Sequence, residues 1–239
     1  MRILISLFFL LLYFSCFGQQ ESKLKDDISE KDLNTINLYR TKIIQYINPN
    51  PDSAIFYSNK IKILSENLNY RKGIVDANYM LGQCQKRLQQ NDSAIVYFKK
   101  SLDLSNKINY EKGKARAYNS IGRTYYLLGK MEASIDACKK AINLTQKFDD
   151  EGNLILADSH LALATAYARQ NQMEDALVNL LVIDSIHNKS NLRPDVIAAA
   201  YQNLGNIYLE LNNYDFSERY YLMANKEFYK LPEQSAKYF

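Results

Sequence analysis

Histidine and serine are among the residues in this chain that could do metal or nucleophilic chemistry. The two histidines, His160 and His187, have no partner at the spacing of a metal site. No histidine lies near Ser53, Ser93 or Ser134 in the sequence to activate a hydroxyl as a nucleophile. The eight glycines form no glycine-rich loop of the kind that holds a phosphate. The sequence therefore predicts no catalytic residue, no metal site and no cofactor.

Arginine, lysine, asparagine and tyrosine could instead bind another protein without making or breaking a covalent bond. An arginine can hold a carboxylate with two parallel hydrogen bonds. An asparagine can bond to an extended peptide backbone, and a tyrosine offers apolar area with a polar tip. Such side chains act together only where the fold brings them to one surface. The organisation of the chain therefore decides which of them matter.

Two segments of the sequence recur with the same offset. The segment DSAI at 52–55 returns at 92–95, and NYRKG at 69–73 returns as NYEKG at 109–113, each after forty residues. Similarity at a fixed period is typical of stacked repeat units. Between turn segments such as QQND and LNNY, apolar residues recur at helical rather than alternating spacing. The sequence therefore predicts an all-α fold built from helix pairs.

Small residues recur twelve positions apart, where the two helices of a pair would cross. Gly82 precedes Ala94 by twelve residues, and Gly122 precedes Ser134 by the same interval. A close crossing leaves no room for a large side chain, and one pair cannot bury its apolar stripe without stacking on the next. The predicted structural positions are Gly82, Ala94, Gly122, Ser134, Ala164, Ala176, Gly205 and Ser217.

These recurring positions resemble the tetratricopeptide repeat, whose consensus has Leu, Gly and Tyr in the first helix and Ala, an aromatic residue and Ala in the second. The fifth unit carries the pattern at Tyr201, Leu204, Gly205, Tyr208, Ser217, Tyr221 and Ala224. Two features depart from the consensus: the units run near forty residues instead of about 34, and the proline after the second helix is missing. Both imply longer second helices. Units of this period are similar to those of bacterial sensor and regulator proteins.

The resemblance implies a right-handed α-solenoid of about five antiparallel helix pairs over residues 30–229. The first unit is degenerate, because Lys42 stands where the later units have Gly or Ala. Residues 19–29 are expected to form a linker, and 230–239 a tail or a truncated next helix. The expected units are 30–69, 70–109, 110–149, 150–191 and 192–229.

In such a solenoid the first helices line a concave groove, and the small positions set which residues face it. Some grooves of this family hold a C-terminal carboxylate with Asn, Lys and Arg, a pattern that Lys86, Asn119 and Arg123 match in part. The alternative is that these residues are merely solvated. The candidate binding residues are Tyr79, Gln83, Lys86, Arg116, Asn119, Arg123, Tyr126, Thr165, Arg169, Gln202 and Asn206.

Residues 1–18 have the layout of a secretory signal peptide. Arg2 precedes an apolar run over 3–14, and small residues at Cys16 and Gly18 predict cleavage after Gly18. The run is shorter than the about 20 residues of a spanning helix. We expect export to the periplasm or cell envelope of a Gram-negative-type bacterium. A lipoprotein anchored at Cys16, and an uncleaved anchor or buried helix, are the alternatives.

The charge of the chain limits the class of partner, and its cysteine content limits the possible disulfides. The formal charge of +4 falls to +3 without Arg2, and charges of both signs alternate, so no basic face for nucleic acid is expected. Cys84 and Cys138 remain after cleavage, either as two buried thiols on separate helices or as one disulfide. We expect an exported, non-enzymatic scaffold that binds a protein or peptide and meets a membrane only through Cys16. The alternative is the sensory region of a histidine kinase or transcriptional regulator whose transmitter module is absent from this chain.

Overall fold

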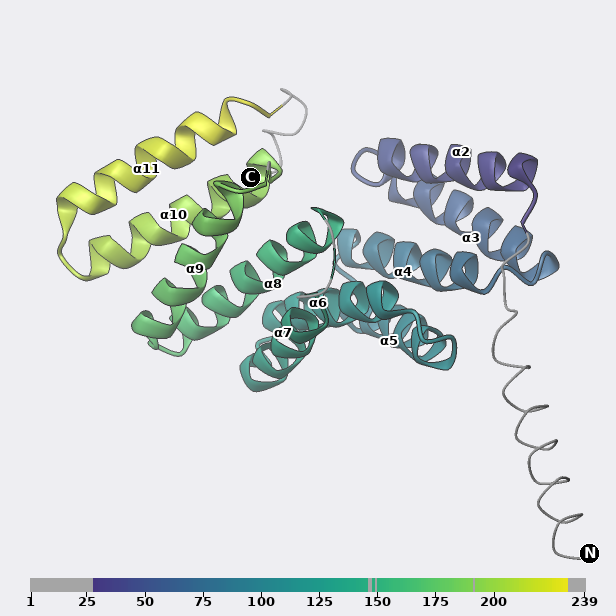
Figure 1. Cartoon of the computed structure of the whole chain (residues 1–239), viewed down its shortest axis with the longest axis horizontal. Coiled ribbons are helices and arrows are strands. Elements are labelled where there is room, and N and C mark those ends of the chain that lie inside the picture. Colours follow the sequence, from purple (N-terminus) through teal and green to yellow (C-terminus); the bar gives the residue numbers. More distant parts are fainter. Residues whose placement is uncertain (1–27, 146–147, 149, 191, 232–239) are drawn as a thin grey trace, which may run out of the picture.

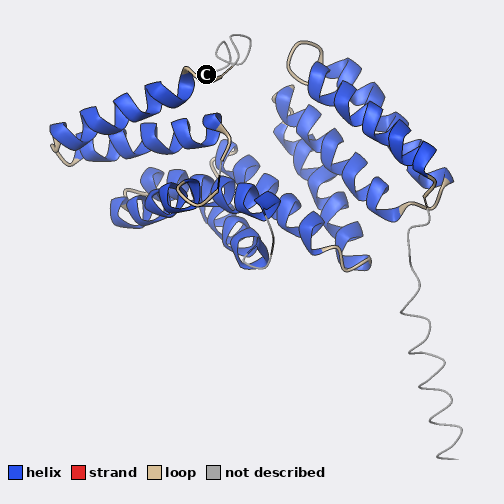
Figure 2. Ribbon diagram, turned by 45° about the horizontal axis from the view of Figure 1, so that its top comes forward, coloured by secondary structure: helices blue, strands red, loops and turns tan. Residues whose placement is uncertain are grey.

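The fold of this protein is entirely helical wherever the computed structural model describes it, over residues 28–145, 148, 150–190 and 192–231. These residues form ten helices and no strand (Figure 2), which confirms the predicted all-α class. The predicted signal peptide, most of the linker and residues 232–239 lie outside the described residues. The helices are α2 (Glu30–Tyr46), α3 (Pro51–Asn67), α4 (Arg71–Arg87), α5 (Asn91–Lys107), α6 (Glu111–Leu127), α7 (Met131–Thr145), α8 (Asp150–Arg169), α9 (Met173–His187), α10 (Pro194–Glu210) and α11 (Tyr214–Phe228).

Consecutive helices pack as five pairs, α2 with α3 through to α10 with α11, and the second helix of each pair packs on the first helix of the next. The pairs follow one another along an open arc, with α2 and α11 at its two ends (Figure 1). The predicted α-solenoid of about five helix pairs is therefore confirmed. None of the helices in the described residues has a stretch long and apolar enough to cross a membrane.

The forty-residue period comes from equal helices and equal turns. Helices α3 to α6 each have 17 residues, and three residues separate each from the next. Every one of these turns holds a residue with positive φ, at Asn69, Gln89, Asn109 and Gly129, twenty residues apart. A left-handed residue just after a helix lets its last carbonyls find backbone partners. The extra length of the unit is thus shared by both helices and is not confined to the second helix.

The repeated segments NYRKG and NYEKG build the corner between units. The amide nitrogen of Tyr110 donates to the carbonyl of Ser105 at 2.9 Å, which closes the turn after α5. The ring of Tyr110 then lies over Gly113, where a Cβ would be 2.5 Å from Oγ of Ser105 and 2.6 Å from Cδ1 of Tyr110. Tyr70 and Gly73 make the same arrangement one unit earlier. The glycine recurs because the tyrosine ring needs its space.

The small positions lie where the two helices of a pair come closest. A Cβ on Gly122 would lie 2.5 Å from Sγ of Cys138 and 3.2 Å from the carbonyl oxygen of Ser134. In the last pair, Oγ of Ser217 donates to the carbonyl of Gly205 at 2.9 Å. These glycines therefore sit at close helix contacts, as the spacing indicates.

Both cysteines of the described region are free and buried, Cys84 on α4 and Cys138 on α7. The interpretation as two buried thiols on separate helices is confirmed. Burial raises the pKa of Cys84 to about 11 and that of Cys138 to about 12, because a thiolate loses its hydration there. Neither thiol is therefore an activated nucleophile.

Candidate binding surface on the first helices

The structure places all eleven predicted binding residues on four first helices, α4, α6, α8 and α10. Neighbouring helices in this row contact one another, so their side chains share one surface. We call this set the first-helix surface. It consists of Tyr79, Gln83 and Lys86 on α4, Arg116, Asn119, Arg123 and Tyr126 on α6, Thr165 and Arg169 on α8, and Gln202 and Asn206 on α10.

Two ion pairs link α2, α4 and α6, which are the first helices of the first three units. Asp76 on α4 is only 7% exposed, and its Oδ2 accepts from Nη2 of Arg40 on α2 at 2.5 Å. Its Oδ1 pairs with Nη2 of Arg116 on α6, whose guanidinium also lies 5.0 Å from the ring centroid of Tyr79. A carboxylate this buried needs such partners to remain charged. Arg116 is therefore committed to holding the units together and is not free for a ligand.

A second charged cluster joins α4, α6 and α8. Nη1 of Arg123 lies 3.3 Å from Oδ1 of Asp158, and the Arg123 side chain is still 42% exposed. Burial, together with a smaller repulsion from Arg123, lowers the pKa of Lys86 to about 7, against the opposing attraction of Asp158. An anion bound beside Lys86 and Arg123 would favour the charged form of the lysine. This cluster can therefore attract a carboxylate from a partner.

The partial carboxylate-binding pattern is split by the packing of α6 on α8. Asn119 is 6% exposed, its Nδ2 donates to the carbonyl of Ile155 at 3.5 Å, and its Oδ1 has no hydrogen-bond partner among the described residues. Gln83 donates to Tyr79 Oη at 2.7 Å and to Ser120 Oγ at 3.1 Å. The structure thus brings Lys86 and Arg123 together, while Asn119 is buried between helices.

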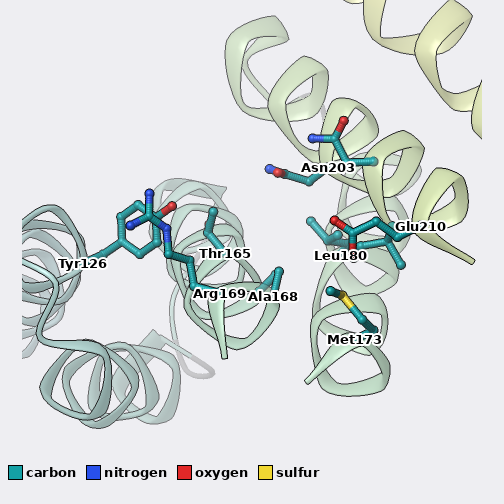
Figure 3. Close-up of a pocket in the computed structure, with 11 residues that line it drawn as sticks. Tyr126, Thr165, Ala168, Arg169, Met173, Leu180, Asn203 and Glu210 are labelled. Atoms are coloured by element: carbon teal, nitrogen blue, oxygen red, sulfur yellow. The ribbon is translucent and has the colours of Figure 1, made fainter. Parts of the chain in front are cut away.

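A pocket of about 230 Å³ opens between α8 and α10, with Met173 and Leu180 of α9 in its lining (Figure 3). We call it the α8–α10 pocket. The guanidinium carbon of Arg169 lies 5.1 Å from the ring centroid of Tyr126 on one side of the pocket, and Glu210 lies on the other. It is lined by Tyr126, Ala164, Thr165, Ala168, Arg169, Met173, Leu180, Asn203, Asn206, Ile207 and Glu210.

One feature of the sequence and one of the packing create this pocket. The positions one and four residues after the small residue hold Arg123 and Tyr126 on α6, but only Thr165 and Ala168 on α8. In addition, α10 packs less closely on α9 than the earlier first helices do on the second helices before them. The loss of two large side chains at a loose junction leaves space that no residue fills.

The two histidines pack against other side chains of the fold and do not form a metal site with the described residues. Nδ1 of His160 is 2.8 Å from Oδ1 of Asn179, and burial lowers the pKa of His160. Nδ1 of His187 is buried and has no hydrogen-bond partner in the part of the chain that the structure describes. Within the residues that the structure describes, no three His, Cys, Asp or Glu side chains are grouped to hold a metal ion.

Comparison with known families settles the relationship of the chain. Two sequence profiles, both described as tetratricopeptide repeat, match it: one at 73–143 and 113–180, the other at 200–224. The chain belongs to the tetratricopeptide repeat family. No curated protein matches the sequence.

Solved structures share the fold of this tetratricopeptide repeat protein at low sequence identity. BtubC (BKLC) from P. vanneervenii is 14% identical, with a TM-score of 0.61 over 82% of this chain and 88% of that one. MamA is 22% identical, with a TM-score of 0.52 over 82% and 93% of the two chains. Aspartyl phosphate phosphatase F from Bacillus subtilis is 18% identical, with a TM-score of 0.55 over 85% and 65%. Identities this low establish the fold alone.

Sequence reasoning missed the ion pairs and most of the pocket of this repeat protein. The three ion pairs join residues 36, 40 and 35 positions apart, close to one repeat period. Opposite charges recurring at that spacing are a signal that could have paired Arg40 with Asp76. For the pocket, the signal is the small residue Ala168 where α6 has Tyr126. The pocket residues outside the predicted binding set are Ala164, which the sequence predicts only as a structural position, and Ala168, Met173, Leu180, Asn203, Ile207 and Glu210.

Proposed function

We propose that this protein is an exported, non-enzymatic scaffold that binds a protein partner along its first-helix surface. The observation that carries the proposal is the convergence of Lys86, Arg123 and Arg169 with the α8–α10 pocket on one continuous row of helices. Helical-repeat solenoids use extended surfaces of this kind for binding. The surface combines cationic side chains with apolar space, which suits an extended segment of another protein.

The charge pattern favours a protein over a nucleic acid as the partner. Asp76 and Asp158 lie among the arginines of the surface, and Glu210 faces the pocket. A nucleic-acid surface needs a concentrated positive field, because each phosphate contact adds one negative charge. Carboxylates interspersed at this density weaken such a field. A protein segment with charges of both signs is therefore the better match.

The test removes Arg123 and Arg169 from the surface and leaves the buried ion pair of Asp76 intact. We would change Arg123 and Arg169 together to Ala, and compare a control in which Lys99 and Lys107 are changed to Ala. Both controls are exposed residues of the second helix α5, and both variants lose two positive charges. Partners would be captured by crosslinking in the cell envelope and quantified by mass spectrometry.

We expect at least one partner to be lost from the arginine variant, by about tenfold or more, and retained by the lysine control. Circular dichroism melting would establish that both variants are folded. If every captured partner is retained equally by the two variants, the first-helix surface does not bind them and the proposal is wrong.

Export is tested separately, because it rests on residues 1–18 alone. Cell fractionation and N-terminal sequencing should find the mature chain in the envelope, beginning at Gln19. Lipid attachment at Cys16 would instead be detected by mass spectrometry. A full-length cytoplasmic protein would contradict export while leaving the binding surface in place.

A sensory region of a signalling protein is the second candidate, favoured by the forty-residue units. Its test is the coding sequence downstream of the chain. A transmembrane segment and kinase motifs in the same reading frame or the next would support it, and their absence from the downstream sequence would remove it.

A further inference from the structure

The α8–α10 pocket has an apolar interior contributed by three helices. Ala164 and Ala168 come from α8, Leu180 from α9 and Ile207 from α10, with Met173 at the start of α9. Ala164, Leu180 and Ile207 are each at most 3% exposed, so the interior is held by the core of the last two units. The pocket is therefore a preformed site and not a gap between mobile side chains.

The size of the pocket limits what can fill it. Its volume is about 230 Å³. A dry cavity of about 150 Å³ is enough to bind benzene. Pockets for drug-sized ligands measure about 300–1,000 Å³. The α8–α10 pocket thus suits one branched or aromatic side chain better than a whole metabolite.

The two amides beside the pocket offer the hydrogen bonds of a peptide backbone. Oδ1 of Asn206 accepts from the hydroxyl of Tyr221 at 2.7 Å, which leaves its Nδ2 to donate. Nδ2 of Asn203 donates to the carbonyl of Ala199 at 2.9 Å, which leaves its Oδ1 to accept. One free donor and one free acceptor match the carbonyl and the N–H of an extended segment.

The charges on the two sides of the pocket differ. Arg169 is exposed, is held against the ring of Tyr126, and makes no ion pair with any residue that the structure describes. Glu210, on the α10 side, is likewise exposed and without an ion pair among the described residues. A carboxylate is attracted on the α8 side and repelled on the α10 side. The pocket therefore distinguishes the two directions in which a charged segment can lie.

We infer that the α8–α10 pocket receives one branched or aromatic apolar side chain of an extended partner segment, with an acidic residue of that segment paired to Arg169. This inference rests on the proposed function and deepens it, because it gives the partner a sequence preference. The amides of Asn203 and Asn206 hold the backbone between these two contacts. Lys86 on α4 and Arg123 on α6 bind other parts of the same partner.

The first experiment fills the pocket. Random peptides displayed on phage would be selected on the purified protein, and the enriched peptides would be synthesised with a fluorescent label. Binding would be measured by anisotropy to Ala168→Tyr, which introduces the residue that α6 has at the equivalent position. The control is Ser185→Tyr, which adds the same side chain at an exposed position of α9 outside the pocket.

We expect enriched peptides to share an apolar residue next to an acidic one, and Ala168→Tyr to weaken their binding about tenfold or more while the control stays within about twofold. Equal binding to Ala168→Tyr and the wild type overturns the inference. The proposed function survives that result if changing Arg123 and Arg169 to Ala still weakens binding. Both fail if no peptide is enriched.

The second experiment tests the arginine contact in a variant that keeps the pocket open. Arg169→Gln changes an exposed side chain, so the fold should be retained. The binding of each enriched peptide would be compared with that of the same peptide carrying an amide in place of the acid. We expect Arg169→Gln to weaken binding of the acidic peptide at least about fivefold and of the amide peptide less than about twofold. Equal losses for the two peptides overturn the assigned contact.

Discussion

Replacing Gly122 by alanine tests the close contact on which the helix pairing of the third unit depends. The new Cβ would lie 2.5 Å from Sγ of Cys138, and 3.2 Å and 3.3 Å from the backbone oxygen of Ser134 and nitrogen of Cys138. The sulfur can move by a rotamer change, but the backbone of α7 cannot. The two helices must therefore separate by a few tenths of an ångström.

The expected magnitude follows from two opposing terms. Overpacking a filled helix contact costs about 1–3 kcal/mol in free energy of unfolding. Replacing glycine by alanine within a helix returns about 0.8–1.0 kcal/mol. Because the obstruction includes backbone atoms, the upper part of the first range applies. We expect Gly122→Ala to be destabilised by about 1–2 kcal/mol.

Urea unfolding followed by far-UV circular dichroism measures this change. A second variant separates the cause: Cys138→Ala alone should cost about 1 kcal/mol for the lost sulfur. Combined with Gly122→Ala, it should cost less than the sum of the single changes by about 0.5 kcal/mol or more, because the nearest atom has been removed. The comparison variant is Gly205→Ala, whose Cβ would meet the ring of Tyr221 at 2.7 Å, a side chain that can shift. A Gly122→Ala protein as stable as the wild type, or more stable, refutes the close-contact reasoning.

Three further predictions concern buried polar and reactive groups. Asp76→Asn leaves two arginines without their counter-charge and should lower the free energy of unfolding by about 2–3 kcal/mol, less than the full value for a buried pair because both arginines are partly exposed. The exposed pair of Asp136 with a lysine is the control, and Asp136→Asn should cost less than about 0.5 kcal/mol in the same urea titration. Because the unfolded chain binds a proton at Lys86 that the folded chain releases near pH 7, wild-type stability should rise relative to Lys86→Met from about pH 7 towards pH 10 and run parallel to it below about pH 6. Cys84 and Cys138 should react with a thiol reagent only as fast as the fold opens, and rapid labelling of either in native buffer would contradict their burial.

The helices and their pairing could be predicted because local rules determine them. Helical spacing of apolar residues and the small residues around Gly122 report directly on contacts within one pair. Asn119 shows where this reasoning stops. Counting from Gly122 places it on the right face of α6, but whether that face is open depends on how α8 packs there, and Ile155 of α8 covers it. The rotation of one unit relative to the next results from many small packing effects, so it cannot be predicted from the residue at any single position.

The pocket illustrates the same limit on a larger scale. Ala168 could be recognised as smaller than its counterpart Tyr126, but a small residue opens a pocket only if the neighbouring helix does not move in to fill the space. In this protein α10 packs less closely on α9 than the earlier first helices do on the second helices before them, and the connection from His187 to Pro194 is longer than the three-residue turns between α3 and α7. The distance between two units joined by such a connection depends on tertiary packing, so it could not be predicted from the sequence.

The loose packing of α10 on α9 also has a consequence for how the solenoid unfolds. In a one-dimensional array, the weakest interface decides where cooperative unfolding is interrupted, so the hairpin α10–α11 can open while the units before it stay folded. A molecule that touches α8 and α10 at once bridges that break and couples the hairpin to its neighbours. Occupation of the site would then be detectable as slower hydrogen exchange in α11, a helix that the bound molecule never contacts.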